Sequence, residues 1–222
     1  MATSGGDSWR RDVRPGVFAI VFGVIVIALS VLIVSVILWP QLGGLDSEVS
    51  ALVRSLRTPG LTRLAVAVTH IADTWSLVIL VPIAAILLYF SGRRSEAVFV
   101  IVVVAGGRLL GVLIQVLVHR SRPAGVNLVP LPPQHSFPSG HALAAILFFG
   151  ALSFIVLGEV RRPWLRYGLI ALFAVVSVAV GMSRVYLGVH WFGDVVGAWL
   201  FGAAVLLVAV LGFFALTQPR AD

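Results

Sequence analysis

The chain is dominated by apolar runs that are long enough to cross a lipid bilayer. Six such runs carry at most one charged residue each: 17–38, 74–90, 97–118, 141–158, 164–182 and 191–216. Hydrophobic residues make up 59% of the sequence and charged residues only 11%. A helix needs about 20 apolar residues to span the hydrocarbon core, and it satisfies its own backbone hydrogen bonds there. We therefore predict an all-α, polytopic membrane protein with six transmembrane helices.

The domain organisation follows from the same pattern. Residues 1–16 are polar and show no apolar periodicity, so we expect a disordered tail before the first run. Residues 17–216 would form a single six-span domain, and 217–222 a short second tail. The first run is too long for the core of a signal peptide, which favours an uncleaved first span.

The segment between the first and second runs has a different character. Its apolar residues recur at steps of three and four: Leu45, Val49, Leu52, Val53 and Leu56. The sequence Thr58-Pro59-Gly60 follows as a turn. This pattern predicts an amphipathic helical segment that lies on the membrane surface and covers the spans.

Arginine counting predicts the orientation, because loops rich in positive charge stay in the cytoplasm. Nine arginines fall on the side of the two tails: Arg10, Arg11, Arg14, Arg93, Arg94, Arg161, Arg162, Arg166 and Arg220. Six fall on the other side: Arg54, Arg57, Arg63, Arg120, Arg122 and Arg184. We therefore expect a multi-pass protein of the cell membrane with cytoplasmic termini. The loop 119–139 and the stretch 183–194 would share the extracytoplasmic face.

The net charge of +7 suits anionic lipid head groups or phosphorylated ligands better than nucleic acid. The chain has no cysteine, which excludes disulfides and thiolate metal sites.

The polar stretch 183–194 interrupts two apolar runs, where charge is costly unless it is used. His190 and Asp194 are four residues apart, so on a helix they would lie one turn apart on one face. A carboxylate in that position orients an imidazole ring and fixes its tautomer. The other ring nitrogen would then be free to attack an electrophile or to bind a metal. A helix-capping polar pair is the structural alternative.

Two further polar clusters are expected on the same face, namely His119 to Pro123 and Ser136 to His141. The second opens a span with Pro138-Ser139-Gly140, which presents a hydroxyl and free amides at a helix N-terminus. Arginine forks, a hydroxyl and helix-end amides together predict a cradle for an oxyanion, most naturally phosphate. Two histidines beside a phosphate would divide nucleophilic attack and proton transfer between them.

Two alternatives compete with this interpretation. The first is a metal site, whose ligands would come from His119, His135, His141, His190 and Asp194. Nearby arginines would repel the cation, which argues against it. The second treats the same residues as interfacial anchors and loop caps.

The three clusters resemble the signature motifs of the type 2 phosphatidic acid phosphatase superfamily in order and spacing. The matching residues are Arg122-Pro123, then Pro138-Ser139-Gly140-His141, then Ser183-Arg184 followed by His190 and Asp194. The resemblance implies a helical-bundle phosphatase that acts on lipid phosphates at the outer leaflet without a metal or other cofactor. It also implies site roles. His190 would be the nucleophile, Asp194 its orienting partner and His141 the general acid, while Arg122, Ser139, Gly140 and Arg184 would hold the phosphate oxygens.

The chain departs from the first family motif at one position. That motif begins with a lysine seven residues before the arginine, and Gln115 occupies that position here. Gln115 would then offer the phosphate only a neutral amide donor, which is weaker than an ammonium. We expect a nearby cation to compensate. Arg120 is the main candidate for this phosphate contact and His119 the lesser one.

Arg108 lies near the middle of the third apolar run, where an unpaired charge is costly. Arg108, Gln115 and Arg122 are spaced by sevens, so they should share a face that is turned toward the bundle interior. We expect Arg108 to pair with a polar or acidic group there, more in a structural than in a catalytic role.

The sequence thus predicts a membrane phosphatase that removes the terminal phosphate of a lipid phosphate or diphosphate through a phosphohistidine. The candidate substrates are a polyprenyl diphosphate, phosphatidylglycerol phosphate and phosphatidic acid. One alternative is a phosphotransferase that passes the phosphate to another lipid. Another is a transporter or lipid-binding protein on the same scaffold.

Overall fold

The computed structural model describes residues 39–131, 133 and 135–217. The predicted span 17–38, the predicted tail 1–16 and residues 218–222 of the predicted tail 217–222 lie outside these residues. The described part is all helical, as predicted. Its helices are α2 (Trp39–Ser55), α3 (Pro59–His70), α4 (Thr74–Phe90), α5 (Arg94–Val118), α6 (Gly140–Glu159), α7 (Pro163–Tyr186) and α8 (Phe192–Thr217).

Four helices in the described region, α5 to α8, are long and apolar enough to cross a membrane. A fifth span results if α3 and α4, which meet at an angle of 48°, are counted as one broken span. The runs predicted at 97–118, 141–158, 164–182 and 191–216 are therefore confirmed as helices, each within a few residues of its expected bounds. The run at 74–90 coincides with α4, whereas the total of six spans stays a prediction.

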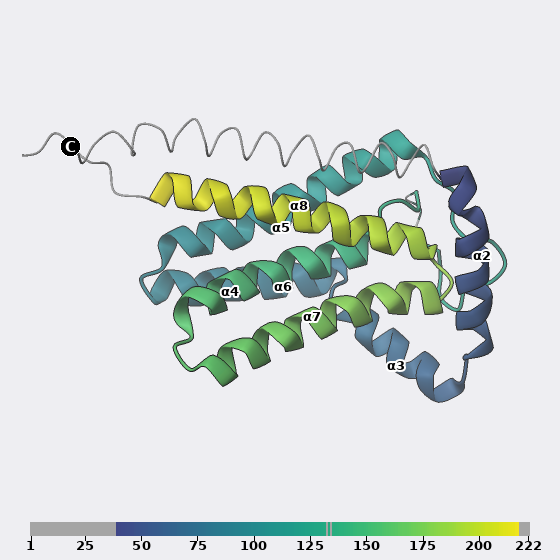
Figure 1. Cartoon of the computed structure of the whole chain (residues 1–222), viewed down its shortest axis with the longest axis horizontal. Coiled ribbons are helices and arrows are strands. Elements are labelled where there is room, and N and C mark those ends of the chain that lie inside the picture. The colour runs from purple at the N-terminus through teal and green to yellow at the C-terminus, as the bar shows by residue number, and fades with distance from the viewer. Residues whose placement is uncertain (1–38, 132, 134, 218–222) are drawn as a thin grey trace, which may run out of the picture.

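Helix α6 is the centre of the bundle. It contacts α5, α7 and α8, and Figure 1 shows these helices running side by side. Its alanines Ala142, Ala144, Ala145 and Ala151 are completely buried. Small side chains allow helix axes to approach closely in a membrane, where packing rather than the hydrophobic effect holds helices together. The alanine-rich first half of α6 thus brings its polar N-terminus close to the neighbouring helices.

Helices α2 and α3 form a layer at one end of this bundle. In Figure 1, α2 crosses the ends of α7 and α8, both of which it contacts. Arg57, which follows α2, donates from Nη2 to the carbonyl of Tyr186 at 2.8 Å, and Thr62 Oγ1 lies 3.1 Å from the Tyr186 hydroxyl. These contacts fasten the layer to the end of α7. That the segment lies on the extracytoplasmic membrane surface stays a prediction.

The inward face of α2 differs in part from the predicted apolar stripe. Val49 and Val53 pack against the core as expected, but the other inward positions are Asp46 and Ser50, both buried. The three leucines of the predicted stripe, Leu45, Leu52 and Leu56, are 48%, 63% and 56% exposed. The helix is rotated in this way because Asp46 has buried hydrogen-bond partners at the end of the bundle.

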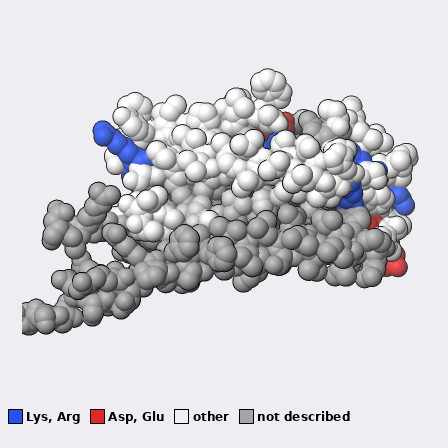
Figure 2. Space-filling model, turned by 90° about the horizontal axis from the view of Figure 1, so that it is seen from above, with Lys and Arg blue, Asp and Glu red and all other residues white. Residues whose placement is uncertain are grey.

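The loops that join α4 to α5 and α6 to α7 lie at the opposite end of the bundle from α2 (Figure 1). Arg93 Nη2, in the first of these loops, forms an ion pair with Oε1 of Glu159, the last residue of α6, at 3.1 Å. On the face shown in Figure 2, charged atoms of the described residues lie mostly toward the two ends, and uncharged residues fill most of the area between them, apart from one small charged group. This distribution is typical of a helical bundle that lies across a bilayer.

Candidate active site

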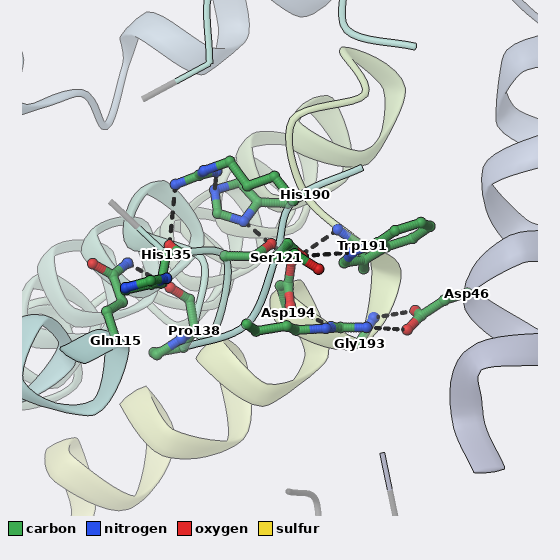
Figure 3. Close-up of polar contacts among 12 residues, drawn as sticks. Asp46, Gln115, Ser121, His135, Pro138, His190, Trp191, Gly193 and Asp194 are labelled. Carbon is green, nitrogen blue, oxygen red and sulfur yellow. Dashed lines mark hydrogen bonds and ion pairs between the residues drawn. The ribbon is translucent and has the colours of Figure 1, made fainter. Parts of the chain in front are cut away.

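The three predicted clusters meet at the end of the bundle that α2 covers. The loop after α5 carries Arg120 and Arg122, the N-terminus of α6 carries Ser139 to His141, and the turn between α7 and α8 carries His190. Figure 3 shows how closely these segments approach one another around Asp194. The sequence prediction that the loop and the 183–194 stretch meet is therefore confirmed.

The backbone of the loop runs along the turn between α7 and α8. Leu128 N donates to Leu187 O at 2.9 Å, and Ser136 N donates to Arg120 O at 2.8 Å, so the two arms of the loop are joined to each other and to the turn. Gly188 has a φ of +72°, and a Cβ there would lie 2.4 Å from Val126 O. Glycine is required at this position both for the left-handed backbone and for the close contact.

His190 and Asp194 form the expected pair. His190 Nδ1 lies 3.3 Å from Asp194 Oδ2, and both side chains are buried. The pair does not share a helix, however, because α8 begins at Phe192 and His190 lies in the preceding turn. Asp194 Oδ2 also accepts from Trp191 N at 2.9 Å. The carboxylate thus folds back over the start of α8, and this turn brings it to the imidazole.

The tautomer of His190 follows from its neighbours. Arg122 Nη1 lies 2.9 Å from His190 Nε2, and a guanidinium can only donate, so Nε2 is the acceptor. The proton is then on Nδ1 and is donated to Asp194. Burial lowers the pKa of His190 to about 4, although Asp194 acts in the opposite direction. The ring is therefore neutral at pH 7, and its Nε2 lone pair is directed at the Arg122 guanidinium. A guanidinium is also a good partner for a phosphate.

Asp194 is completely buried and satisfied on both oxygens. Oδ1 accepts from Arg120 Nη1, and Oδ2 accepts from the Ser136 hydroxyl in addition to Trp191 N and His190. Partners on both oxygens hold this carboxylate in one orientation.

Arg122 is held by backbone carbonyls as well as by His190. Its Nη1 donates to Val189 O at 2.7 Å and its Nη2 to His135 O at 3.2 Å. The adjacent Pro123 is completely buried, which anchors the loop at this point. The guanidinium therefore sits beside His190 Nε2, the nitrogen that the sequence predicts to be free for attack, and a phosphoryl group at that nitrogen would need a positive partner.

The N-terminus of α6 presents donors toward this site. The backbone N–H of Ser139 donates to Asp194 O at 3.0 Å, which ties the start of α6 to the start of α8. The Ser139 hydroxyl is buried and makes no hydrogen bond within the described residues. His141 follows Gly140 in the first turn of α6.

Arg184 approaches from the last turn of α7. Its Nη1 donates to Thr69 Oγ1 of α3 at 2.7 Å, while its Nε is buried and unpaired in the part of the chain that the structure describes. A buried polar group without a partner costs free energy, on the order of 1 to 3 kcal/mol. Arg184 Nε and the Ser139 hydroxyl are thus two buried donors whose cost an oxyanion would remove.

Gln115 and Arg108 support the α6 N-terminus from below. Gln115 Nε2 donates to Pro138 O at 2.9 Å and Arg108 Nη1 to Gly140 O at 2.6 Å. A Cβ on Gly140 would lie 2.7 Å from Arg108 Nη1. The prediction that Arg108 pairs with a polar group inside the protein is confirmed. Gln115 uses its amide donor on a carbonyl of the phosphatase-like motif.

Arg120 lies between two carboxylates. Its Nη1 contacts Asp194 Oδ1 and its Nη2 contacts Asp46 Oδ2 at 2.7 Å. In this arrangement its guanidinium is directed at Asp46 and Asp194, so the idea that Arg120 binds phosphate in place of the missing lysine stays a prediction. The ring of His119, the lesser candidate, lies tilted by 52° against the ring of His135 at a centroid distance of 4.5 Å.

The sequence interpretation missed three residues that hold this site together, namely Asp46, Thr69 and Ser136. Ser136 was visible as part of a polar cluster, and Asp46 as a charge within an amphipathic segment. Thr69 gave no signal at all.

The metal alternative named His119, His135, His141, His190 and Asp194 as ligands. Within the described residues, no three histidine, aspartate or glutamate side chains are grouped so as to hold a metal ion, and this holds for those five residues as well.

Comparison with known proteins gives a consistent result. Phosphatidylglycerophosphatase B of Bacillus subtilis (strain 168) is 29% identical over 169 residues, which cover 76% of this chain and 82% of that protein. Undecaprenyl-diphosphatase of Sulfolobus acidocaldarius is 33% identical over 135 residues, covering 59% of this chain and 61% of that one.

Solved structures agree with the fold. A crystal structure of a transmembrane PAP2 type phosphatidylglycerolphosphate phosphatase from Bacillus subtilis superimposes with a TM-score of 0.75 at 25% identity, covering 88% of this chain and 98% of that one. The crystal structure of Aquifex aeolicus LpxE superimposes with a TM-score of 0.62 at 23% identity, covering 75% and 94% respectively, and supports the fold alone.

The family profile described as PAP2 superfamily matches residues 96–218. This range begins in α5 and extends through α8, so it includes all three clusters and excludes α2 and α3. The family that the sequence resembles is thereby confirmed, and the chain belongs to the PAP2 superfamily.

Proposed function

We propose that this protein hydrolyses the terminal phosphate of a membrane lipid phosphate or diphosphate, with His190 as the nucleophile. The observation that carries the proposal is the arrangement around His190. Its neutral ring is oriented through Nδ1 by Asp194, and its Nε2 lies beside the Arg122 guanidinium.

In the first step, the Arg122 donor moves from His190 Nε2 to a phosphate oxygen of the bound substrate. Nε2 then attacks phosphorus in line with the leaving oxygen, the N–P bond forms and the P–O bond breaks. His141 gives its proton to the leaving lipid oxygen. Asp194 stabilises the positive charge that develops on the His190 ring.

In the second step, water attacks phosphorus and the N–P bond breaks. Neutral His141 accepts a proton from that water, which returns it to its starting state, and inorganic phosphate leaves with His190 restored. The Ser139 hydroxyl, the Gly140 amide, Arg122 and Arg184 hold the phosphate oxygens throughout. Phosphoryl transfer depends mainly on such positioning and charge stabilisation.

The substrate class is supported by the membrane setting and by what the relatives are named for. A polyprenyl diphosphate, phosphatidylglycerol phosphate and phosphatidic acid all present a terminal phosphate at the bilayer surface, where the site lies beneath α2. From the arginine distribution we infer that this surface is extracytoplasmic and that the termini are cytoplasmic.

Phosphate release from these three lipids by the purified protein is the decisive measurement. We expect turnover with water as acceptor, unchanged activity in EDTA, inhibition by vanadate and an acid-labile, base-stable phosphohistidine on rapid quenching. Transfer of the phosphate to a second lipid without phosphate release would indicate a phosphotransferase. Binding without turnover would indicate a transport or binding protein. Activity that is lost in EDTA and restored by a divalent ion would favour the metal alternative.

A further inference from the structure

Asp46 lies on α2, outside the three clusters and outside the residues that the family profile matches. Its side chain nevertheless reaches the same network. Oδ2 accepts from Arg120 Nη2 at 2.7 Å and Oδ1 accepts from the backbone N–H of Gly193 at 2.8 Å. Figure 3 shows Asp46 approaching from α2, with Gly193 and Asp194 between it and His190.

The first contact completes a chain of charged groups. Asp46 holds one end of the Arg120 fork, Asp194 holds the other, and Asp194 in turn accepts from His190 Nδ1. The side chains of Asp46, Arg120 and Asp194 are 4%, 9% and 0% exposed, so water screens these charges little. A guanidinium between two fixed carboxylates has one preferred orientation, because leaving either partner would leave a buried charge unpaired.

The second contact acts on the backbone that carries Asp194. Gly193 is in the first turn of α8, one residue before Asp194, and its N–H is one of the donors that a helix start leaves without an intrahelical partner. Asp46 satisfies this donor from another helix. The position of Asp194 is therefore determined from both sides, through its carboxylate by Arg120 and through its backbone by Gly193.

We propose that Asp46 is a positioning residue for the nucleophile. It holds Arg120 against Asp194 and fixes the first turn of α8, so that Asp194 Oδ2 stays directed at His190 Nδ1. The inference rests on the proposed function, since it concerns the orientation of the attacking histidine. It also gives α2 a part in catalysis without any contact to substrate.

Asp46→Asn is the informative substitution, because it keeps the shape and the acceptor for Gly193 and removes the charge that holds Arg120. We expect kcat to fall about 10- to 100-fold, the range that loss of a charged hydrogen bond produces. KM should change less than twofold, since no phosphate ligand is removed. Glu48→Gln is the matched control, because it removes the same charge from an exposed position of the same helix and should retain full activity.

A merely structural role for Asp46 would lower the thermal stability or the yield of folded protein and leave kcat per folded molecule unchanged. Variants are therefore compared at equal amounts of monodisperse protein, with their melting temperatures recorded. If Asp46→Asn does not fold, Asp46→Ser, which also removes the charge that holds Arg120, takes its place, with the same expected fall in kcat. A folded Ser variant with the wild-type kcat would overturn the proposal.

A double variant tests the route through Arg120. In an Arg120→Gln background, Asp46→Asn should change kcat less than twofold, because the contact that it weakens is already gone. Fully additive losses would show that Asp46 does not act through Arg120 and would overturn the proposal.

Rapid quenching separates this inference from the proposed function. With dioctanoyl phosphatidic acid and farnesyl diphosphate as probes, the wild type should form phosphohistidine, and Asp46→Asn should form the same species about 10- to 100-fold more slowly. Absence of phosphohistidine in the turning-over wild type would refute the proposed function. Equal rates of its formation in wild type and Asp46→Asn would refute the role of Asp46 alone.

Discussion

The N-termini of α6 and α8 lie at the same site but treat their backbone donors in opposite ways. At α8, the protein supplies its own anions, since Asp46 accepts from Gly193 N and Asp194 accepts from Trp191 N. At α6, Ser139 is the N-cap residue but its hydroxyl makes no capping bond, although serine in this position usually makes one. Backbone donors at the start of α8 are thus paired with carboxylates, whereas the Ser139 hydroxyl at the start of α6 stays unpaired within the described residues.

The difference suggests a division of work. A helix N-terminus attracts anions through its dipole and its unpaired amides. The carboxylates at α8 neutralise that end and hold His190, so this end serves the proposed nucleophile. The end of α6 carries no carboxylate, so it is the one that suits a substrate phosphate. The contact from Ser139 N to Asp194 O joins the two ends.

The largest expected effect comes from substitutions at the start of α8, where His190 and Asp194 pair. His190→Ala should lower phosphate release by at least about a thousandfold, because removing a nucleophile costs several orders of magnitude. Asp194→Asn should also be severe but less so, since the ring stays in place with its orientation impaired. His70→Ala, at a side chain that is 65% exposed, is the control and should retain activity. Release by His190→Ala above about a thousandth of wild type would contradict the covalent role.

The next largest effect comes from a substitution at the N-terminus of α6. Gly140→Ala places a Cβ 2.7 Å from Arg108 Nη1 and hinders the approach of a phosphate to the helix-end amides. We expect kcat/KM to fall on the order of 100-fold, with weaker inhibition by vanadate. Gly158→Ala, near the other end of α6 with open space around its Cβ, is the matched control. Equal vanadate inhibition in wild type and Gly140→Ala would show that this helix end does not hold the oxyanion.

The pH dependence of kcat/KM tests the α8 end separately, because it reports on the charge of the His190 ring. Burial lowers the pKa of His190 to about 4 from its usual value near 6.5. The nucleophile is the neutral form, so its contribution to kcat/KM should persist as pH falls below 6 and be lost as pH falls through about 4.

The pH profile of kcat/KM is measured with two substrates whose phosphates have different pKa values. The comparison shows whether each fall of kcat/KM on the acid side comes from the substrate or from the enzyme. A limb that moves with the substrate belongs to the substrate, and one that stays near pH 4 belongs to the enzyme. An enzyme limb near pH 6.5 for both substrates would contradict the burial of His190.

The smallest effect concerns the support beneath α6. Gln115 is 7% exposed and its amide donates to Pro138 O. A lysine can donate to the same carbonyl, so Gln115→Lys should change kcat/KM less than about threefold. Arg120→Ala should be more damaging, by the equivalent of about 1.5 to 3 kcal/mol for a lost charged contact.

The double variant decides between two roles for Arg120. If Arg120 binds phosphate in place of the family lysine, Gln115→Lys should partly restore the activity of Arg120→Ala. If Arg120 acts through Asp46 and Asp194, as its contacts in this structure suggest, Gln115→Lys should restore nothing. The measurement is kcat/KM for the two single variants and the double variant.

Much of the fold could be predicted because the signals are local. A run of about 20 apolar residues predicts a membrane helix whatever its neighbours are, and the bounds of α5, α6, α7 and α8 agree with the runs within a few residues. The same applies to Arg108, for which the cost of an unpaired charge among apolar residues was enough to predict a buried partner.

The candidate site was predictable only as a set of residue types. The sequence by itself determined which side chains are candidates for the chemistry, since arginine forks, a helix-end serine and a histidine with a carboxylate four residues away form a recognisable pattern. It did not determine that His190 lies off the helix, nor that Arg120 lies between two carboxylates.

Those features depend on contacts between residues far apart in the chain. Asp46 meets Gly193 across 147 positions and Arg120 across 74, and Thr69 meets Arg184 across 115. Only the packing of α2 and α3 across the end of the bundle brings these groups together. The local sequence shows that a charged residue in an apolar setting needs a partner. Which residue becomes that partner is decided by the packing of helices that are far apart in the chain.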